Sequence, residues 1–196
     1  MKEMRVRLTL TEDALGMAPT SNKIYADFIA ANAPDAKTRE EEIAENGIEQ
    51  TVNAGTTVFP KLPDGRPFFW DYQIRGMFKD SIGMLRRVPG TACSKAKAYK
   101  KLVDGLLFVR ERRIPIAVNG ELGNCQRALR TDGPSSSRTA LASSETVPAG
   151  STCEFTVLML TDEMEPIVRE CLDYGALRGL GQWRNSGAGR FIWEEV

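Results

Sequence analysis

A segment near the carboxy terminus combines the residue types that hold phosphate groups. It interleaves four glycines with three arginines: Gly179, Gly181, Gly187 and Gly189 with Arg178, Arg184 and Arg190. Glycine has no Cβ, so its backbone approaches a ligand closely and adopts positive φ without strain. Successive backbone N–H groups in such a loop form an anion-binding concavity, and the guanidinium fork matches phosphate geometry. The composition therefore predicts a polyanion-binding loop.

Two regular elements are expected to position this loop. Residues 163–177 have the apolar spacing of a helix, and residues 189–195 alternate like a strand. The loop would then join a helix to the final strand of the chain.

The distribution of charge indicates the same class of ligand. The chain has 26 Lys and Arg and 26 Asp and Glu residues, so its formal net charge is zero. Residues 71–141 nevertheless carry 14 basic and 6 acidic side chains, against 8 and 11 in residues 1–70 and 4 and 9 in residues 142–196. A basic segment between acidic flanks is typical of polyanion binding.

The composition also excludes several kinds of chemistry. Histidine is absent, which rules out His-based acid–base catalysis and zinc sites that need imidazole. The four cysteines are widely spaced and are expected to be free thiols. No apolar run approaches about 18 residues, and the first residues lack a signal-peptide core. We therefore expect a cytoplasmic protein with no metal, no cofactor and no membrane partner.

The order of the expected elements predicts the fold class. A chain of 196 residues usually forms one domain, here residues 1–196. Strands are expected at 3–10, 106–110, 113–118, 153–160 and 189–195, and helices at 71–87 and 163–177. This order fits an α+β, ferredoxin-like (RRM-like) βαββαβ core.

The remaining segments are expected to be additions to this core. Residues 11–70 form a long insertion between the first strand and the first helix, with a surface helix expected at 37–45 and a strand at 52–59. Residues 131–144 are rich in Ser, Thr and Gly and are expected to be a flexible loop.

Four stretches resemble the RAMP superfamily, the repeat-associated proteins of CRISPR systems. Residues 179–191 resemble its glycine-rich loop, and residues 145–157 resemble its Pro-x-Gly turn before the fourth strand. Residues 71–80 are similar to the helix start of its backbone subunits, with Arg75 at a lysine position, Gly76 at the glycine and Lys79 at an arginine position. Residues 14–16 resemble the ending of its first strand. The four stretches occur in the family's order.

The resemblance implies a guide-RNA-binding backbone subunit like those of type III and type I effectors. Its partners would be guide RNA and other CRISPR effector subunits, or copies of itself along the RNA, and residues 11–70 would be a thumb-like insertion. Backbone subunits that also cut target RNA have an aspartate in the loop after the first strand, and Asp27 and Asp35 occupy that region, but no catalytic residue is assigned. The implied RNA-binding residues are Arg75, Gly76, Lys79, Arg178, Gly179, Gly181, Arg184, Asn185, Gly187, Gly189 and Arg190.

Two other hypotheses remain open from the sequence. Residues 71–73 replace the family's Gly and hydroxyl residues, and the chain is neutral overall. Both features favour a stand-alone RAMP-like protein, of viral or mobile-element origin, that binds or mimics an effector subunit and inhibits it. The second hypothesis is a metal-dependent ribonuclease that uses Asp27, Asp35 or Asp71.

Overall fold

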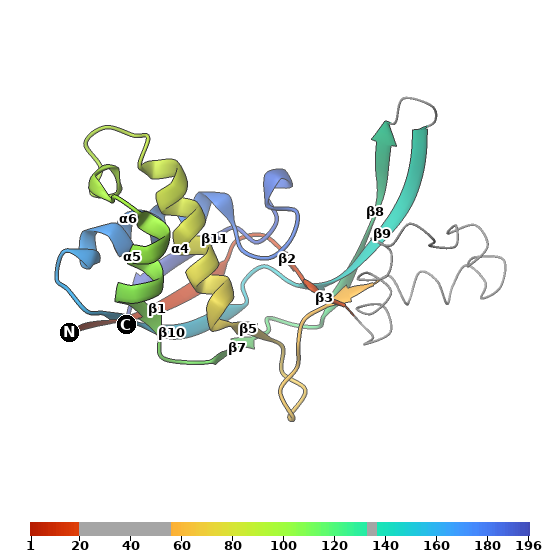
Figure 1. Cartoon of the computed structure of the whole chain (residues 1–196). Helices are drawn as coiled ribbons and strands as arrows, with labels where there is room; N and C mark the ends of the chain where they lie inside the picture. The colour runs from red at the N-terminus through yellow and green to blue at the C-terminus, as the bar shows by residue number, and fades with distance from the viewer. Residues whose placement is uncertain (20–55, 133–136) are drawn as a thin grey trace, which may run out of the picture.

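The structure is a computed structural model that describes residues 1–19, 56–132 and 137–196. The described part combines mainly antiparallel sheets with helices packed on one side (Figure 1). This content is compatible with the expected α+β class. The expected helix at 37–45 and most of the expected strand at 52–59 lie outside the described residues.

A six-stranded sheet forms the centre of the molecule. Its strands follow the order β11-β1-β10-β7-β5, and β6 also pairs with β10. β1 lies between β10 and β11 and is antiparallel to both, so that Val6 is opposite both Phe155 and Glu195. The bounds are β1 (Lys2–Leu10), β5 (Phe68–Trp70), β6 (Leu107–Val109), β7 (Arg113–Ala117), β10 (Thr152–Met159) and β11 (Phe191–Glu195).

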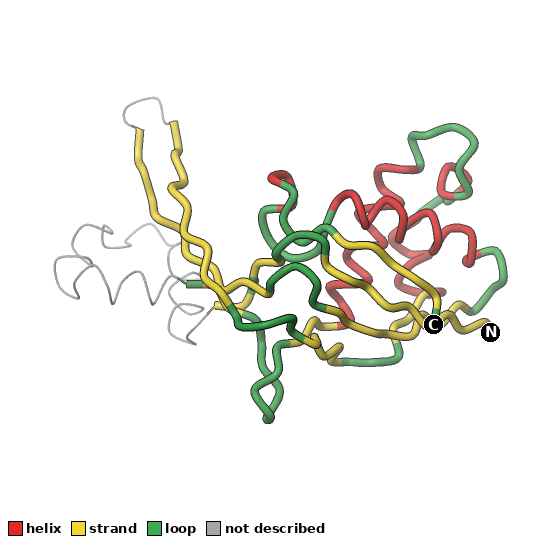
Figure 2. The backbone as a smooth tube through the Cα atoms, turned by 180° about the vertical axis from the view of Figure 1, so that it is seen from behind, coloured by secondary structure: helices red, strands yellow, loops and turns green. Residues whose placement is uncertain are grey.

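The alternation of residues in β1 gives the sheet two different faces. Met4, Val6 and Leu8 are buried, and helices cover their side of the sheet, as Figures 1 and 2 show. On the other side Arg5 and Arg7 lie 2.7 and 2.8 Å from Glu154. Hydrogen bonds from Arg7 and Arg5 hold the pKa of Glu154 below its usual value.

Three α-helices lie in the described residues: α4 (Asp71–Leu85), α5 (Tyr99–Leu106) and α6 (Met164–Arg178). α4 buries Ile74, Met77, Phe78 and Ile82, because apolar residues at this spacing share one helix face. α6 packs against α4, and Ser81 Oγ donates a hydrogen bond to the carbonyl of Cys171. Short 3₁₀ helices η1 (Cys93–Lys95) and η2 (Arg184–Ser186) lie in the connections.

A second sheet extends from the body of the molecule. It has the order β2-β9-β4-β3, with β8 paired to β9. The β8–β9 hairpin projects away from the helices (Figure 1). The bounds are β2 (Ala14–Leu15), β3 (Ala18–Pro19), β4 (Thr57–Val58), β8 (Gly123–Asp132) and β9 (Ser137–Val147).

The hairpin corrects one expectation from the sequence. Residues 137–144, expected as part of a flexible loop, belong to β9 and pair in register with β8. Cross-strand hydrogen bonds with β8 pair the backbone groups of these residues. The polar side chains of the segment do not predict this pairing. The strand at 153–160 and the helices at 71–87 and 163–177 are confirmed to within two residues at each end.

Candidate nucleic-acid interface

The glycine-rich loop joins α6 to β11 and folds tightly on itself. Gly179, Gly181, Gly187 and Gly189 have φ values of 85°, 85°, 88° and 69°. A Cβ on Gly189 would lie 1.9 Å from the carbonyl oxygen of Leu180, and one on Gly181 would lie 2.7 Å from that of Leu15. These two glycines are therefore required by contacts within the protein. Gly187 meets only the side chain of Arg190, at 3.6 Å.

Backbone hydrogen bonds fix the loop to the turn after β1. Leu180 N donates to Gly189 O at 2.9 Å, and Gly189 N donates to Asp13 O at 2.8 Å. Thr11 N donates to Arg190 O at 2.8 Å. The loop therefore has a defined conformation before any ligand binds.

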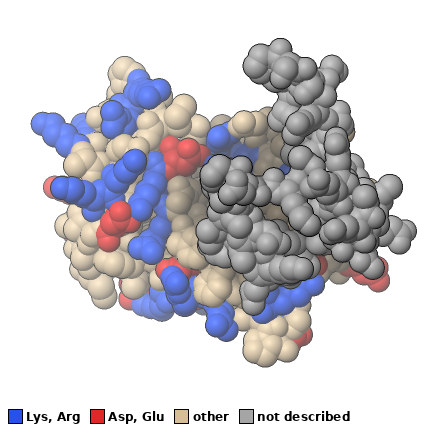
Figure 3. Space-filling view, turned by 45° about the vertical axis from the view of Figure 1, so that its right-hand side comes forward, with Lys and Arg blue, Asp and Glu red and all other residues tan. Residues whose placement is uncertain are grey.

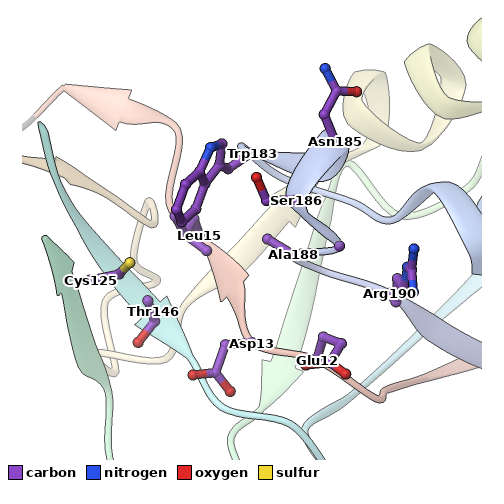
Figure 4. Close-up of a pocket in the computed structure, with 11 residues that line it drawn as sticks. Glu12, Asp13, Leu15, Cys125, Thr146, Trp183, Asn185, Ser186, Ala188 and Arg190 are labelled. Atoms are coloured by element: carbon purple, nitrogen blue, oxygen red, sulfur yellow. The ribbon is translucent and has the colours of Figure 1, made fainter. Parts of the chain in front are cut away.

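A cleft of about 660 Å³ opens between this loop, the turn after β1 and the base of the hairpin. Asp13 and Glu12 line one side, Trp183 and Arg190 come from the loop, and Thr146 comes from β9 (Figure 4). The cleft has the size of a typical small-ligand site. The sequence does not indicate Glu12 and Asp13 as site residues, because it does not show how the turn after β1 packs against the glycine-rich loop.

Trp183 and Arg127 form a pair beside this cleft. The Arg127 guanidinium lies 4.4 Å from the centroid of the Trp183 ring, and Trp183 is 44% exposed. Nε and Nη1 of Arg127 are buried without a hydrogen-bond partner in the described residues. Arg127 was missed from the sequence, because nothing there indicates that β8 reaches the loop.

The loop lies beside α4, and Asp80 joins the two. Arg184 Nη1 lies 3.0 Å and Arg178 Nε 3.4 Å from Asp80 Oδ2. Arg178 also donates a hydrogen bond to Asn185 Oδ1. Both arginines are therefore already in ion pairs within the protein before any ligand binds.

The two cations at the start of α4 lie on its other flank, toward α5. Arg75 Nη2 is 3.6 Å from Asp71 Oδ2, and Lys79 Nζ is 2.5 Å from Asp104 Oδ1. Nε of Arg75 is buried without a hydrogen-bond partner in the described part of the chain. Gly76 lies between these flanks on exposed surface, with no atom within 4 Å of the place a Cβ would take.

Arg190 differs from the other expected cations. It is exposed, and its Nε donates to the carbonyl of Leu177 at 3.1 Å. Within residues 1–19, 56–132 and 137–196, no carboxylate lies at ion-pair distance from it. Arg190 therefore presents its positive charge at the edge of the cleft without an ion-pair partner in those residues.

Tyr72 belongs to a stack of rings and guanidinium groups at the edge of the main sheet. Its ring is stacked on Trp70 with centroids 6.0 Å apart. The guanidinium of Arg112 lies 5.3 Å from the Trp70 centroid and 6.0 Å from that of Tyr72. Tyr72 keeps 50% of its surface exposed.

Of the carboxylates expected for a nuclease, only Asp71 lies within the described residues. Asp27 and Asp35 lie outside the described residues. Asp71 is 9% exposed and is ion-paired with Arg75 and Arg112. The described residues contain no group of three or more His, Cys, Asp or Glu side chains placed to hold a metal. They also contain no helix long and apolar enough to span a membrane.

Comparison with known proteins finds similarity at the level of structure. No family model and no curated protein matches its sequence. Its fold is similar to a chain in the cryo-EM structure of a type III-B Cmr-beta complex bound to cognate target RNA, with a TM-score of 0.58 and 13% identity. That match covers 100% of this chain and 61% of the other, so this chain spans about six tenths of its length.

A second similar structure comes from a type IV-B CRISPR complex. The TM-score is 0.50 at 13% identity, and the match covers 100% of this chain and 90% of the other. The chain therefore has a fold found among the subunits of CRISPR effector complexes.

Proposed function

We propose that this protein is an RNA-binding subunit of a CRISPR-type ribonucleoprotein effector, related to the RAMP superfamily. It grips the phosphates of a guide RNA with the glycine-rich loop and the basic residues at the start of α4. Its partners are the guide RNA and other effector subunits, or further copies of itself along that RNA. No catalytic residue is assigned.

The topology of the main sheet supports the family assignment. The order β11-β1-β10-β7, with α4 following the first strand and α6 preceding the last, is the order expected of a ferredoxin-like βαββαβ core. The chain segment between β1 and α4 supplies β2 to β5 in its described parts. It has the place in the chain expected of the thumb-like insertion.

The observation that carries the proposal is the juxtaposition of the loop with α4 and the cleft. The contact between Arg184 and Asp80 brings two segments about 100 residues apart to one surface, at 3.0 Å. Arg190 and Gly187 line the cleft beside them. A phosphate there would contact Arg190 directly and compete with Asp80 for Arg178 and Arg184.

Unpartnered nitrogens around the loop and α4 also favour an anionic ligand. Buried polar atoms normally have hydrogen-bond partners. The buried nitrogens of Arg75 and Arg127 have none among the described residues. Phosphate oxygens are acceptors of the kind that guanidinium groups prefer.

Direct binding to single-stranded RNA tests the proposal. The purified chain, freed of nucleic acid at high salt, is titrated against a labelled single-stranded RNA over a range of salt concentrations. We expect binding that weakens steeply as salt rises, because each neutralised phosphate releases counterions. Absence of binding at low salt would reject the function.

One observation favours the alternative, an effector-binding inhibitor. Four of the expected phosphate ligands are ion-paired within the chain: Arg75, Lys79, Arg178 and Arg184. A protein-interaction module needs no free phosphate ligands. Capture of an intact effector complex by the immobilised chain, with and without ribonuclease, separates the two functions. Capture that survives removal of free RNA supports the inhibitor, and RNA-dependent capture supports the subunit.

A further inference from the structure

A strongly basic surface in the described residues lies outside the cleft. Residues 81–103 contain six basic side chains and no acidic one. We call this surface the α4–α5 basic patch; its members are Arg86, Arg87, Lys95, Lys97, Lys100 and Lys101. In Figure 3, Lys and Arg side chains gather on this helical side of the molecule.

Every member of the patch is exposed, and none is neutralised. All six side chains are exposed, and no described carboxylate lies at ion-pair distance from any of them. The expected cations of α4 and the glycine-rich loop are the opposite case, since Arg75, Lys79, Arg178 and Arg184 are half-buried and each is paired with a carboxylate.

Contacts between the elements hold the patch together. The guanidinium of Arg86, just after α4, lies 5.4 Å from the ring centroid of Tyr99, at the start of α5. Thr91 Oγ1 donates to the carbonyl of Leu85 at 3.1 Å and folds the connection back on α4. The ends of α4 and α5 that carry the cations are therefore adjacent.

A carboxylate from α6 fixes the connection that carries Lys95 and Lys97. Ala92 N and Cys93 N donate to the two carboxylate oxygens of Glu170 at 2.7 and 2.9 Å. The side chain of Cys93 is fully buried. The cations are thus presented on an ordered backbone, which lowers the entropy lost when a partner binds.

The cations of the α4–α5 basic patch destabilise the free protein. α5 has no acidic residue in its first turn and no side-chain cap, and Lys100 and Lys101 lie there instead. Positive charge at a helix amino terminus is unfavourable, because the helix dipole places partial positive charge there. The mutual repulsion of six cations adds to this cost. A polyanion that lay over the patch would relieve both effects.

We propose that the α4–α5 basic patch binds the phosphate backbone of a nucleic acid, as a second contact separate from the cleft. Four of its six members are lysines, which are depleted at protein–protein interfaces and common among phosphate contacts. The apolar residues of α5 do not form an exposed face for a membrane, since Val103 is fully buried and Tyr99, Leu102 and Leu106 pack against the core. The proposal does not depend on RNA binding by the glycine-rich loop.

A pair of matched double variants tests this assignment. Lys100→Gln with Lys101→Gln removes two charges from the patch, and Lys2→Gln with Arg66→Gln removes two exposed charges elsewhere. Each is titrated against a labelled single-stranded RNA of about 30 nucleotides, long enough to extend beyond one site of about 4–16 nucleotides. We expect the patch variant to lower the salt slope by about 1.4, at about 0.7 per lost phosphate contact, and the control to leave it unchanged. Equal slopes for the patch variant and the wild type would overturn the proposal.

Two further binding measurements distinguish binding at the patch from binding at the cleft, and RNA from other polyanions. Arg190→Ala, at the cleft, is combined with the patch variant, and additive losses are expected for two independent contacts. Loss in the patch variant alone would support the patch and reject the cleft. Tighter binding of the wild type to polyglutamate or to anionic lipid vesicles than to RNA would overturn the proposal in favour of a protein or a membrane partner.

Discussion

At the scale of single residues, phosphate binding at the site depends on the carboxylates beside the arginines as much as on the arginines themselves. Asp80 accepts contacts from both Arg178 and Arg184, and Asp71 pairs with Arg75 and Arg112. An incoming phosphate must compete with these carboxylates. Arg190, which has no such partner in the described residues, is therefore expected to make the strongest contact with RNA.

Asp80→Asn is predicted to strengthen RNA binding. The substitution frees two guanidinium groups and removes a negative charge beside the proposed phosphate path. Partly exposed ion pairs are worth about 0.2–1 kcal/mol, so we expect an affinity gain of about three-fold and a small loss of stability. Fluorescence anisotropy with labelled RNA measures the gain. Unchanged affinity would indicate that Arg178 and Arg184 do not contact RNA.

Glu170→Gln is predicted to destabilise the protein in a pH-dependent way. Burial raises the pKa of Glu170, but hydrogen bonds from Cys93 and Ala92 outweigh it and hold that pKa below the ordinary value of 4.5. A lowered folded-state pKa stabilises the fold above the unfolded value, and this contribution disappears as the pH falls through the folded value.

Urea unfolding over a range of pH measures this effect. We expect Glu170→Gln to lower the free energy of unfolding by about 1 kcal/mol at neutral pH. The difference from wild type should shrink below pH 4.5. A constant difference at all pH values would contradict the assigned role of the carboxylate.

At the scale of elements, the glycines of the loop have different tasks. Gly189 and Gly181 let the loop pack against backbone carbonyls, whereas a Cβ on Gly187, which also has positive φ, would meet only the side chain of Arg190 at 3.6 Å. The sequence predicts a glycine-rich loop but does not distinguish these cases, since the contacts involve distant residues such as Leu15.

Gly189→Ala and Gly187→Ala form a matched pair that tests this difference. Both residues have positive φ, which costs an L-residue about 1–2 kcal/mol. Only at Gly189 does the added Cβ also meet a carbonyl, at 1.9 Å. We expect Gly187→Ala to lose about 1 kcal/mol and Gly189→Ala clearly more, measured by urea unfolding. Equal losses would show that the two glycines do not differ in their tasks.

Gly76→Ala is predicted to stabilise the protein and to weaken RNA binding. An alanine in a helix interior is favoured over glycine by about 0.5–1 kcal/mol, and no atom lies within 4 Å of the new Cβ. The added methyl would hold an RNA backbone away from α4. Thermal unfolding and RNA titration are both needed, and a stabilised variant with full RNA affinity would remove Gly76 from the interface.

Elements with a clear apolar period could be predicted from the sequence, whereas several others, among them α5, β8 and β9, could not. Apolar residues alternate along β1 and recur at helical spacing along α4, because each element packs one face on the core. α5 was missed, since lysines and Gly105 obscure the spacing of Tyr99, Leu102, Val103 and Leu106. β9 was missed because its stability comes from pairing with β8 and not from its composition.

At the scale of the whole molecule, the net charge of zero is distributed over two surfaces that differ in how their charges are paired. The open face of the main sheet carries Arg5, Arg7 and Glu154 in mutual ion pairs. The helical side carries the α4–α5 basic patch. The charge count of residues 71–141 predicts an excess of positive charge, but only the fold shows which cations are left without a carboxylate.

The cleft lies where the two sheets, the loop and the turn after β1 meet. This place depends on four chain segments, from Glu12 to Arg190. The glycine-rich loop noted in the sequence lines this cleft, whereas no residue of α4 does. Asp13, Arg127 and Thr146 could not be predicted, because no local pattern encodes their approach.

The central claim, that Arg190 and the glycine-rich loop hold RNA phosphates, is tested most directly by the salt dependence of RNA binding. A short single-stranded RNA is titrated against the wild type and Arg190→Ala at several salt concentrations. We predict weaker binding by the variant and a slope of log K against log salt that is lower by about 0.7, the loss of one phosphate contact. An Arg190→Ala protein with the affinity and the slope of the wild type would contradict the claim.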